Sequence, residues 1–174
     1  LGIARLLRAP AGHAPDQTVH DGYGKSQTYR QLHARIGQLA AALTHLGLTK
    51  GATIAVMDWD SIRYLECFFA IPMIGATLHT VNVRLSPEQV LYTINHAEDD
   101  AILCHEDFLP LLLPLLPRVT RPLKLILLSD RDDAPLPAEF AGEYEQLLAA
   151  EGPGFAFPDL PEDTRATLFY TTGT

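Results

Sequence analysis

The sequence predicts an α/β fold in which helices flank a largely parallel sheet. Short apolar runs typical of buried strands alternate along the chain with longer segments that carry apolar side chains at helical spacing. The segments between the strands are long enough for crossover helices, which parallel strands require. The composition, 47% hydrophobic and 20% charged over 174 residues, is typical of a globular domain with its own core.

The clearest helix is predicted over residues 28–46. Its apolar side chains recur at intervals of four and three, which places them on one stripe: Leu32, Ile36, Leu39, Leu43 and Leu46. Thr28 and Gln31 predict a capping box at its start, and Gly47 predicts its end.

A strand, a second helix and a second strand follow over residues 53–57, 61–74 and 77–81. The inner face of the helix is expected to hold its large apolar residues, Ile62, Leu65, Phe68, Phe69 and Met73. Pro72 should end this helix, because proline cannot donate the backbone hydrogen bond that a helix interior needs.

The second half of the chain continues the alternation. Ser86, Pro87 and Gln89 predict a helix start, with an apolar face of Val90, Leu91 and Ile94 that continues to about residue 97. Further strands are predicted at 101–104, 124–128 and 166–170, and further helices at 108–116 and 142–150. Residues 130–161 are expected to form a surface excursion around the last of these helices.

Composition and charge exclude several classes of protein. A net charge of −8 argues against nucleic-acid binding, which needs a basic face. The longest apolar stretch, residues 68–78, is about half of what a membrane-spanning helix needs.

No signal-peptide pattern opens the chain, and Cys67 and Cys104 are predicted to be buried structural thiols; a cytoplasmic protein is therefore expected. The seven histidines lack metal-ligand spacing.

The chemistry is expected in the C-terminal segment. A predicted strand runs into Tyr170, Thr171, Thr172, Gly173 and Thr174. Glycine lets the backbone approach a ligand closely, successive N–H groups can form an anion-binding nest, and threonine hydroxyls add donors for phosphate or lone pairs for a metal ion. By itself this short segment is more typical of a strand end and a turn, and it lacks the Gly-Lys-Ser/Thr ending of a Walker loop.

In its context, however, the segment resembles the phosphate-loop motif of the adenylate-forming family, Tyr-Thr-Ser/Thr-Gly-Thr-Thr-Gly-x-Pro-Lys-Gly. This family includes acyl-CoA synthetases, luciferases and peptide-synthetase adenylation domains. Two earlier segments agree in order and approximate spacing. Residues 27–32 resemble the family's Thr-Tyr-x-Glu-Leu segment, with Gln31 where Glu is usual, and residues 69–76 resemble its second core segment, a helix end followed by Gly-Ala and a strand.

A central block narrows the resemblance to the medium- and long-chain fatty acyl-CoA synthetases. Residues 75–89 contain His-Thr-x-Asn-x-Arg-Leu, and Asn95-His96-Ala97-Glu98-Asp99 follows. Peptide-synthetase domains normally carry a Pro-Ile-Asp type of sequence at this point. The resemblance covers nearly the whole chain and is weakest over residues 130–161. It implies a single incomplete domain over residues 1–174, the N-terminal part of a large AMP-binding domain.

The resemblance implies a ligase that uses ATP, Mg²⁺ and coenzyme A. A fatty-acid carboxylate would attack the α-phosphate of ATP to give an acyl-adenylate, and CoA thiolate would then displace AMP. Thr171, Thr172, Gly173 and Thr174 would contribute to the loop that holds the β- and γ-phosphates, and Thr171 would approach Mg²⁺. The loop lysine, the later Tyr-Gly-x-Thr-Glu segment, the ribose-binding aspartate and the C-terminal domain's lysine have no counterpart here. No catalytic residue is therefore assigned, and the 174-residue chain alone is expected to be inactive.

Two alternatives stay open at the level of sequence. The chain could be a non-catalytic α/β binding module or a dimerisation module, and the resemblance also makes a homodimer plausible. It could also belong to an adenylate-forming ligase for an aromatic or short acid.

Several other polar residues are interpreted as structural. His79 and Asn82 follow a strand and could orient a loop near the site, and Arg84 could pair with a carboxylate at the next helix start, but a structural role is expected. Residues 58–60 lie at the carboxyl end of a strand, where α/β folds often bind ligands, but a polar turn that caps the next helix is the expected explanation.

Overall fold

A six-stranded parallel sheet forms the centre of the fold. The computed structural model describes residues 3–131 and 133–171. The strand order is β7-β6-β5-β3-β4-β8, and every pairing in this sheet is parallel. The strands span Thr53–Met57 (β3), Thr77–Thr80 (β4), Ala101–His105 (β5), Lys124–Leu128 (β6), Phe140–Glu143 (β7) and Thr167–Phe169 (β8). The predicted α/β class is therefore confirmed.

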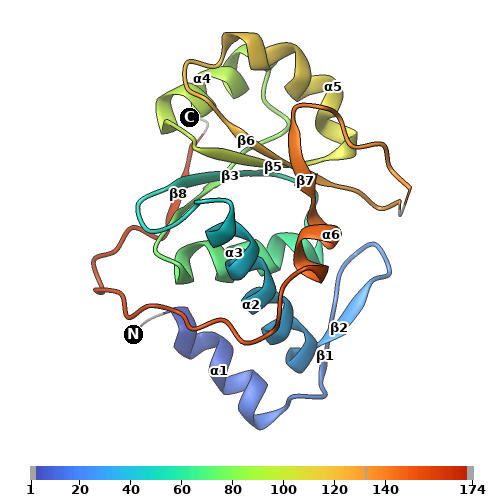
Figure 1. Ribbon diagram of the computed structural model, residues 1–174, viewed down its shortest axis with the longest axis vertical. Coiled ribbons are helices and arrows are strands. Elements are labelled where there is room, and N and C mark those ends of the chain that lie inside the picture. Colours follow the sequence, from blue (N-terminus) through green and yellow to red (C-terminus); the bar gives the residue numbers. More distant parts are fainter. Residues whose placement is uncertain (1–2, 132, 172–174) are drawn as a thin grey trace.

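Helices cover both faces of the sheet (Figure 1). One face carries α1 (Ile3–His13), α2 (Tyr29–His45), α3 (Ile62–Met73) and α6 (Tyr144–Ala149), and the other carries α4 (Pro87–Ala97) and α5 (Leu109–Leu112). Alternate residues of the strands supply the two cores. In β3, Ile54 and Val56 face the first group of helices, whereas Ala55 and Met57 face the second.

The predicted capping boxes of the two best-defined helices are present. The Thr28 hydroxyl accepts from the backbone N–H of Gln31, whose side chain accepts from the N–H of Thr28. Ser86 and Gln89 make the same reciprocal pair at α4. These pairs satisfy backbone donors that the first turn of a helix leaves free.

The predicted inner face of α3 is only partly correct: Ile62 and Met73 are buried, but the three predicted residues between them are not. Phe68 is 41% exposed, and Leu65 and Phe69 are only partly buried, whereas Glu66 and Cys67 are fully buried. A count of large apolar side chains missed part of this face because it also contains small residues, Cys67 and Ala70, and the charged residues Arg63 and Glu66. Glu66 is stabilised inside by hydrogen bonds from three other elements, as described below.

Three elements lie outside the predicted pattern: α1, strand β7, and an antiparallel hairpin of β1 (Thr18–His20) and β2 (Ser26–Thr28). The predicted helix over 108–116 is divided into α5 and two 3₁₀ segments, Glu106–Phe108 and Leu113–Arg118. Its prolines remove the donors that a continuous α-helix would need.

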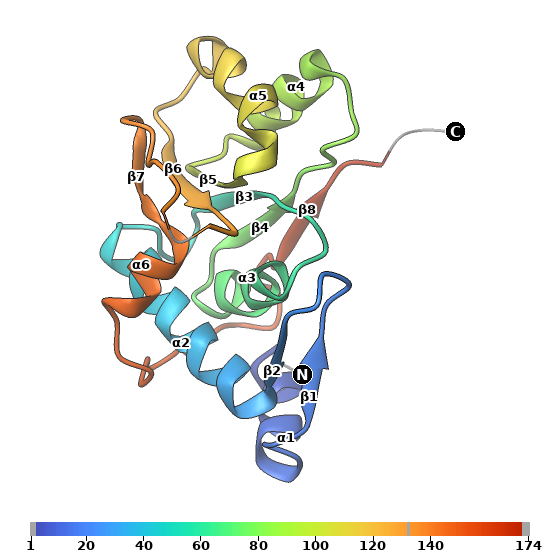
Figure 2. The same cartoon turned by 90° about the vertical axis from the view of Figure 1, so that its right-hand side faces the viewer.

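The segment between α6 and β8 crosses the outer side of α2 before it reaches the sheet. Gly37 permits this crossing, because a Cβ atom there would lie 2.7 Å from the carbonyl oxygen of Pro153. Figure 2 shows β8 beside β4 at one side of the sheet, opposite β7.

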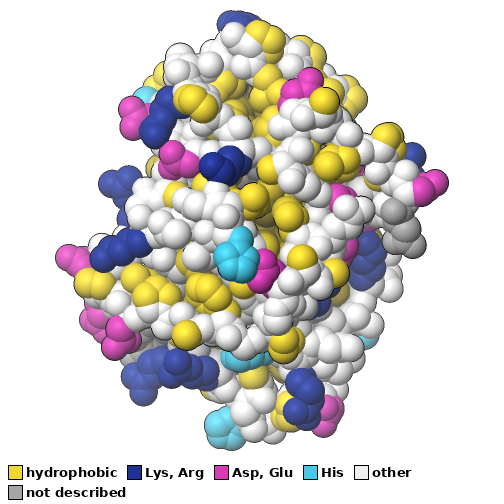
Figure 3. All heavy atoms as spheres, viewed as in Figure 1, with side chains coloured by type: hydrophobic (Ala, Val, Ile, Leu, Met, Phe, Trp, Pro, Cys, Tyr) yellow, Lys and Arg dark blue, Asp and Glu magenta, His cyan; other side chains and the backbone are white. Residues whose placement is uncertain are grey.

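Charged side chains of both signs are interspersed on the face shown in Figure 3. In the described part of the chain, no helix has the length and apolarity needed to cross a membrane.

Candidate functional site

The carboxyl ends of the six strands lie along one edge of the sheet, because the strands are all parallel. The chain changes direction within this sheet: β4 follows β3 on one side, and β5 returns to the other side of β3. Ligands of open α/β sheets bind beside such a switch point, outside the carboxyl ends of the strands. Two polar groups of residues lie along this edge.

The first group lies at the end of β8. Phe169 pairs with Thr80 of β4, and Tyr170 and Thr171 leave the sheet directly afterwards. Thr171 is exposed, so its hydroxyl is accessible to a ligand. Three other predicted phosphate-binding residues, Thr172, Gly173 and Thr174, lie outside the described residues.

Tyr170 is held against the α4 side of the sheet by two histidines. Its hydroxyl is hydrogen-bonded to His96 Nδ1 at 2.8 Å, and its ring meets the His79 ring edge-on with centroids 5.4 Å apart. His96 in turn stacks on Tyr92, with centroids 5.3 Å apart. Partial burial raises the pKa of the Tyr170 phenol, so the phenol keeps its proton at neutral pH.

His79 is itself fixed by a buried carboxylate. Its Nδ1 lies 2.8 Å from Asp99 Oδ2, and both side chains are fully buried. Burial raises the pKa of Asp99, while the hydrogen bond from His79 acts in the opposite direction. The other imidazole nitrogen, Nε2, is buried without a hydrogen-bond partner among the described residues.

Asn82 and Arg84 are placed in the turn that follows β4. The Asn82 side chain accepts from the backbone N–H of Arg84 at 3.0 Å, so it stabilises this turn locally.

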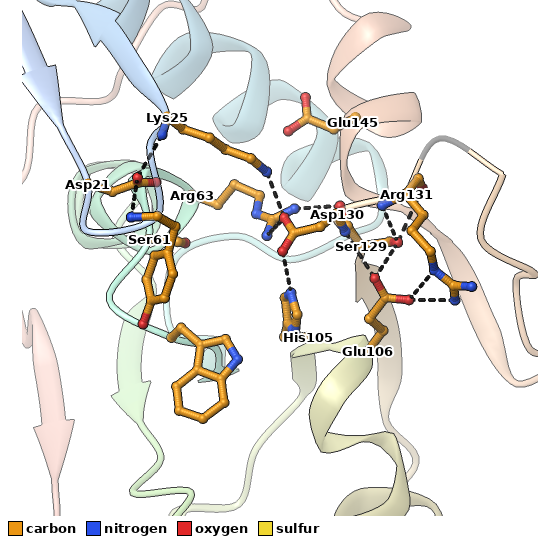
Figure 4. Close-up of polar contacts among 12 residues, drawn as sticks. Asp21, Lys25, Ser61, Arg63, His105, Glu106, Ser129, Asp130, Arg131 and Glu145 are labelled. Carbon is orange, nitrogen blue, oxygen red and sulfur yellow. Dashed lines mark hydrogen bonds and ion pairs between the residues drawn. The ribbon is translucent and has the colours of Figure 1, made fainter.

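The second group surrounds the switch point between β3 and β5 (Figure 4). Asp130, which follows β6, accepts from Lys25 Nζ at 2.6 Å and from Arg63 at 2.8 Å, and its other oxygen lies 3.3 Å from His105 Nε2. Lys25 belongs to the β1–β2 hairpin, Arg63 to α3, and His105 to the end of β5. Asp130 therefore connects three elements that are distant in sequence.

Residues 58–60 form the predicted polar turn. The Asp58 side chain accepts hydrogen bonds from the backbone N–H of Trp59 and from the Ser61 hydroxyl, and Ser61 caps α3 by accepting from the N–H of Tyr64. The structural interpretation of this turn is thus confirmed. Burial raises the pKa of Asp58, and its hydrogen bond with Ser61 opposes that shift.

A cavity of about 560 Å³ opens beside this second group, between the hairpin, α2 and α3. Three cations line it, and each has a carboxylate partner. Lys25 and Arg63 contact Asp130, and Arg35 contacts Glu66 and Glu145. Because these charges are already neutralised, the cavity presents no unpaired cation that would attract a phosphate.

The ion pair between Arg35 and Glu66 reaches into the core, because the Glu66 side chain is fully buried. Glu66 accepts from Arg35 at 2.6 Å, from Gln27 at 3.1 Å and from the Tyr144 hydroxyl at 2.6 Å. A buried carboxylate is stable only when its oxygens are satisfied in this way. The sequence carried no signal for this cluster, because its members come from four separate elements.

Of the two groups, only the end of β8 presents an exposed hydroxyl ahead of a glycine-containing segment. Magnesium prefers oxygen ligands, and the Thr171 hydroxyl is of that type. The described residues contain no group of three or more His, Cys, Asp or Glu side chains arranged to hold a metal ion.

Comparison with protein families gives a match over nearly the whole chain. The family described as "AMP-binding enzyme" matches residues 7–174. The chain belongs to this family of AMP-binding enzymes.

Curated relatives in this AMP-binding family are named as CoA ligases. The chain is 38% identical over 139 residues to the 3-methylmercaptopropionyl-CoA ligase of Ruegeria pomeroyi, a match that covers 79% of this chain and 26% of the relative. It is 34% identical over 151 residues to the medium-chain-fatty-acid–CoA ligase of Ectopseudomonas oleovorans, covering 84% of this chain and 27% of the relative. The chain thus spans about a quarter of the length of these relatives.

Solved structures of AMP-binding enzymes share the fold. The anthranilate CoA ligase crystallised with anthranoyl-AMP superposes with a TM-score of 0.90 at 18% identity, over 99% of this chain and 32% of that one. The fold of this chain is therefore the fold of about a third of that CoA ligase.

Proposed function

We propose that the protein containing this chain is an ATP-dependent acyl-CoA ligase that activates a medium- or long-chain fatty acid. The fatty-acid carboxylate attacks the α-phosphate of ATP, releasing pyrophosphate and leaving an acyl-adenylate. The CoA thiolate then attacks the acyl carbon, and AMP leaves with the bonding electrons. Membership of the AMP-binding family and relatives named as CoA ligases support this proposal.

One observation carries the proposal within the structure. Strand β8 ends at the carboxyl edge of the parallel sheet, so the Tyr170–Thr171 motif begins where α/β folds bind ligands. In the proposed enzyme, Thr171, Thr172, Gly173 and Thr174 bind the β- and γ-phosphates of ATP, and the Thr171 hydroxyl approaches the Mg²⁺ that accompanies it.

The contribution of these residues is positioning and charge stabilisation. A carboxylate and a triphosphate repel each other, and donors fixed around the phosphates lower the cost of bringing them together. We assign no acid–base or nucleophilic role to any residue of this chain.

The preference for an aliphatic acid rests on the block over residues 75–89 and on the medium-chain relative. A second candidate substrate class is a short thioether acid, because the relative at 38% identity is named as a 3-methylmercaptopropionyl-CoA ligase. The two classes differ in chain length, so a substrate series separates them.

The test is AMP and pyrophosphate release by the full-length protein with ATP, Mg²⁺ and CoA. The acids are octanoate, palmitate, 3-(methylthio)propanoate, butyrate and benzoate. We expect the highest kcat/KM with octanoate or palmitate. A maximum with another acid of the series would move the assignment to that class, and the absence of turnover with all five would favour a non-catalytic binding or dimerisation module.

We also propose a cytoplasmic location and a homodimer. Cys67 and Cys104 are buried free thiols, which suits a reducing compartment. Cell fractionation tests the location, and sedimentation analysis of the full-length protein tests the dimer.

A further inference from the structure

The strand that leads to the proposed phosphate loop is short. β8 has three residues, two of them exposed, and among the described strands it pairs only with β4. A loop that binds phosphate works best when its donors are held in place before the ligand arrives, because ordering them later reduces binding. Contacts beyond the strand are therefore needed to fix the direction in which the chain leaves the sheet.

Tyr170 provides these contacts. Its hydroxyl bonds to His96 at 2.8 Å, and its ring lies against the His79 and His96 rings, with centroids 5.4 and 5.7 Å away. The ring cannot swing away without losing that hydrogen bond and both ring contacts. Thr171 is the next residue, so a backbone shift that moved Thr171, the first residue of the proposed phosphate loop, would also strain the contacts of the Tyr170 side chain.

The histidines are themselves held in place. His79 is immobilised by full burial and by its hydrogen bond with Asp99, and His96 is stacked on Tyr92 of the same helix. The buried Nε2 of His79, which has no partner among the described residues, adds a second observation at this point. A buried nitrogen without a hydrogen-bond partner costs free energy, so the position of this ring is fixed by its burial and by Asp99 rather than by the needs of Nε2.

We propose that His79 and His96 are positioning residues for the phosphate-binding loop and act through Tyr170. This inference rests on the proposed function. It adds that a residue of helix α4 and a residue of strand β4 influence how the nucleotide is bound. Neither histidine touches the substrate in this proposal; they determine how Thr171 is presented to the triphosphate.

The test uses the full-length protein and acid-dependent ATP–pyrophosphate exchange. The variants are Tyr170→Phe, His96→Phe, their double mutant, and His79→Gln. Tyr144→Phe is the matched control. It also removes a phenol oxygen that makes one short hydrogen bond, but Tyr144 follows β7 at the opposite side of the sheet.

We expect Tyr170→Phe and His96→Phe each to raise the KM for ATP about fivefold, the effect of one lost hydrogen bond, and to leave the KM for the fatty acid unchanged. His79→Gln should raise the KM for ATP in the same way. The double mutant should be no worse than either single variant, because both remove the same bond. Tyr144→Phe should lower the melting temperature and leave the KM for ATP unchanged.

Two results would overturn the proposal: an unchanged KM for ATP in Tyr170→Phe, or a double mutant whose effect equals the product of the single effects. Tyr170→Phe keeps the ring and should fold. It therefore tests the positioning role even if His79→Gln does not fold. If the unmodified full-length protein shows no exchange with any acid, the proposed function itself fails; active wild type with unaffected variants rejects only the positioning role.

Discussion

Thr171 is the residue on which the proposed nucleotide chemistry can be tested most directly. It is exposed at the end of β8, and valine has nearly the same shape without the hydroxyl. We expect Thr171→Val to lower kcat/KM for ATP about tenfold and to raise the Mg²⁺ concentration needed for half-maximal activity, because a ligand of the nucleotide–metal complex is lost.

Thr167→Val is the matched control for this prediction. Thr167 is the first residue of β8 and is also exposed, but it lies at the opposite end of the strand from Thr171 and the proposed loop. Equal effects of the two substitutions on kcat/KM would show that the strand responds to valine in general, and the role of the Thr171 hydroxyl would be refuted.

Asp130 gives the chain a contribution to stability that depends on pH. The hydrogen bond from Lys25 lowers the pKa of Asp130 from 3.8 to about 2, and nearby Arg63 acts in the same direction. A lowered pKa in the folded state means that the stabilisation is complete above pH 4 and is lost as the pH falls towards 2. Since the side chain is 53% exposed, solvent screening keeps the effect small, at about 1 kcal/mol or less.

We therefore expect Asp130→Asn to lower the free energy of unfolding at pH 7 more than at pH 2.5. Urea unfolding at the two pH values measures this difference. Asp163→Asn, on an exposed loop, makes the same change in net charge. A destabilisation by Asp130→Asn that is independent of pH would contradict an ionised partner for Lys25.

At the scale of elements, α4 links the helix layer to the proposed site, because it carries His96 and ends just before Asp99. Its start depends on the capping box of Ser86 and Gln89. We expect Ser86→Ala to reduce the free energy of unfolding by about 1 kcal/mol and Ser86→Gly by only a few tenths, measured by chemical denaturation. Equal losses for both substitutions would argue that packing around residue 86, rather than the cap, is what matters.

The sequence predicted those elements whose local signals agree with their packing. Helices α2 and α4 have caps, apolar stripes and clear ends, and the buried strands β3, β5 and β6 are short continuous apolar runs. In each case the local preference and the tertiary environment favour the same structure.

The failures arise where tertiary contacts override local pattern. The buried face of α3 includes Glu66, whose hydrogen-bond partners lie 31 to 78 residues away in the sequence. The β1–β2 hairpin had a usable signal, the turn residues Asp21 and Gly22 between two short polar strands, but its strands lack the apolar alternation that predicts a sheet.

The candidate site was predicted only at its start. The motif at Tyr170 and Thr171 is visible in the sequence because it is contiguous, whereas its contacts with His79 and His96 depend on the pairing of β8 with β4. No periodicity in a single sequence reports which strands are neighbours, so a structural role was the expected one for both histidines, although orientation of a nearby loop was open for His79.

At the scale of the whole molecule, the chain has the edge of the sheet at which we propose that the nucleotide binds, but it spans only about a quarter of the relatives' length. We expect the isolated 174-residue polypeptide to show no ligase activity, because the proposed reaction needs groups that the family places elsewhere. Detectable acid-dependent AMP release by that polypeptide would refute this. Circular dichroism provides the control, since an unfolded polypeptide would be inactive for a different reason.

The short strand β8 has a consequence for how the protein moves. Eighty-six residues separate the end of β4 from the start of β8, and the strand is held from one side by a few backbone bonds. Such a strand can detach by local unfolding at far lower free energy than the central β3. We expect the amides of residues 167–169 to undergo hydrogen exchange faster than those of residues 53–57, and ATP to slow that exchange selectively. Because attachment of β8 and binding of ATP would then be coupled, every contact that keeps β8 attached would also raise the affinity for the nucleotide.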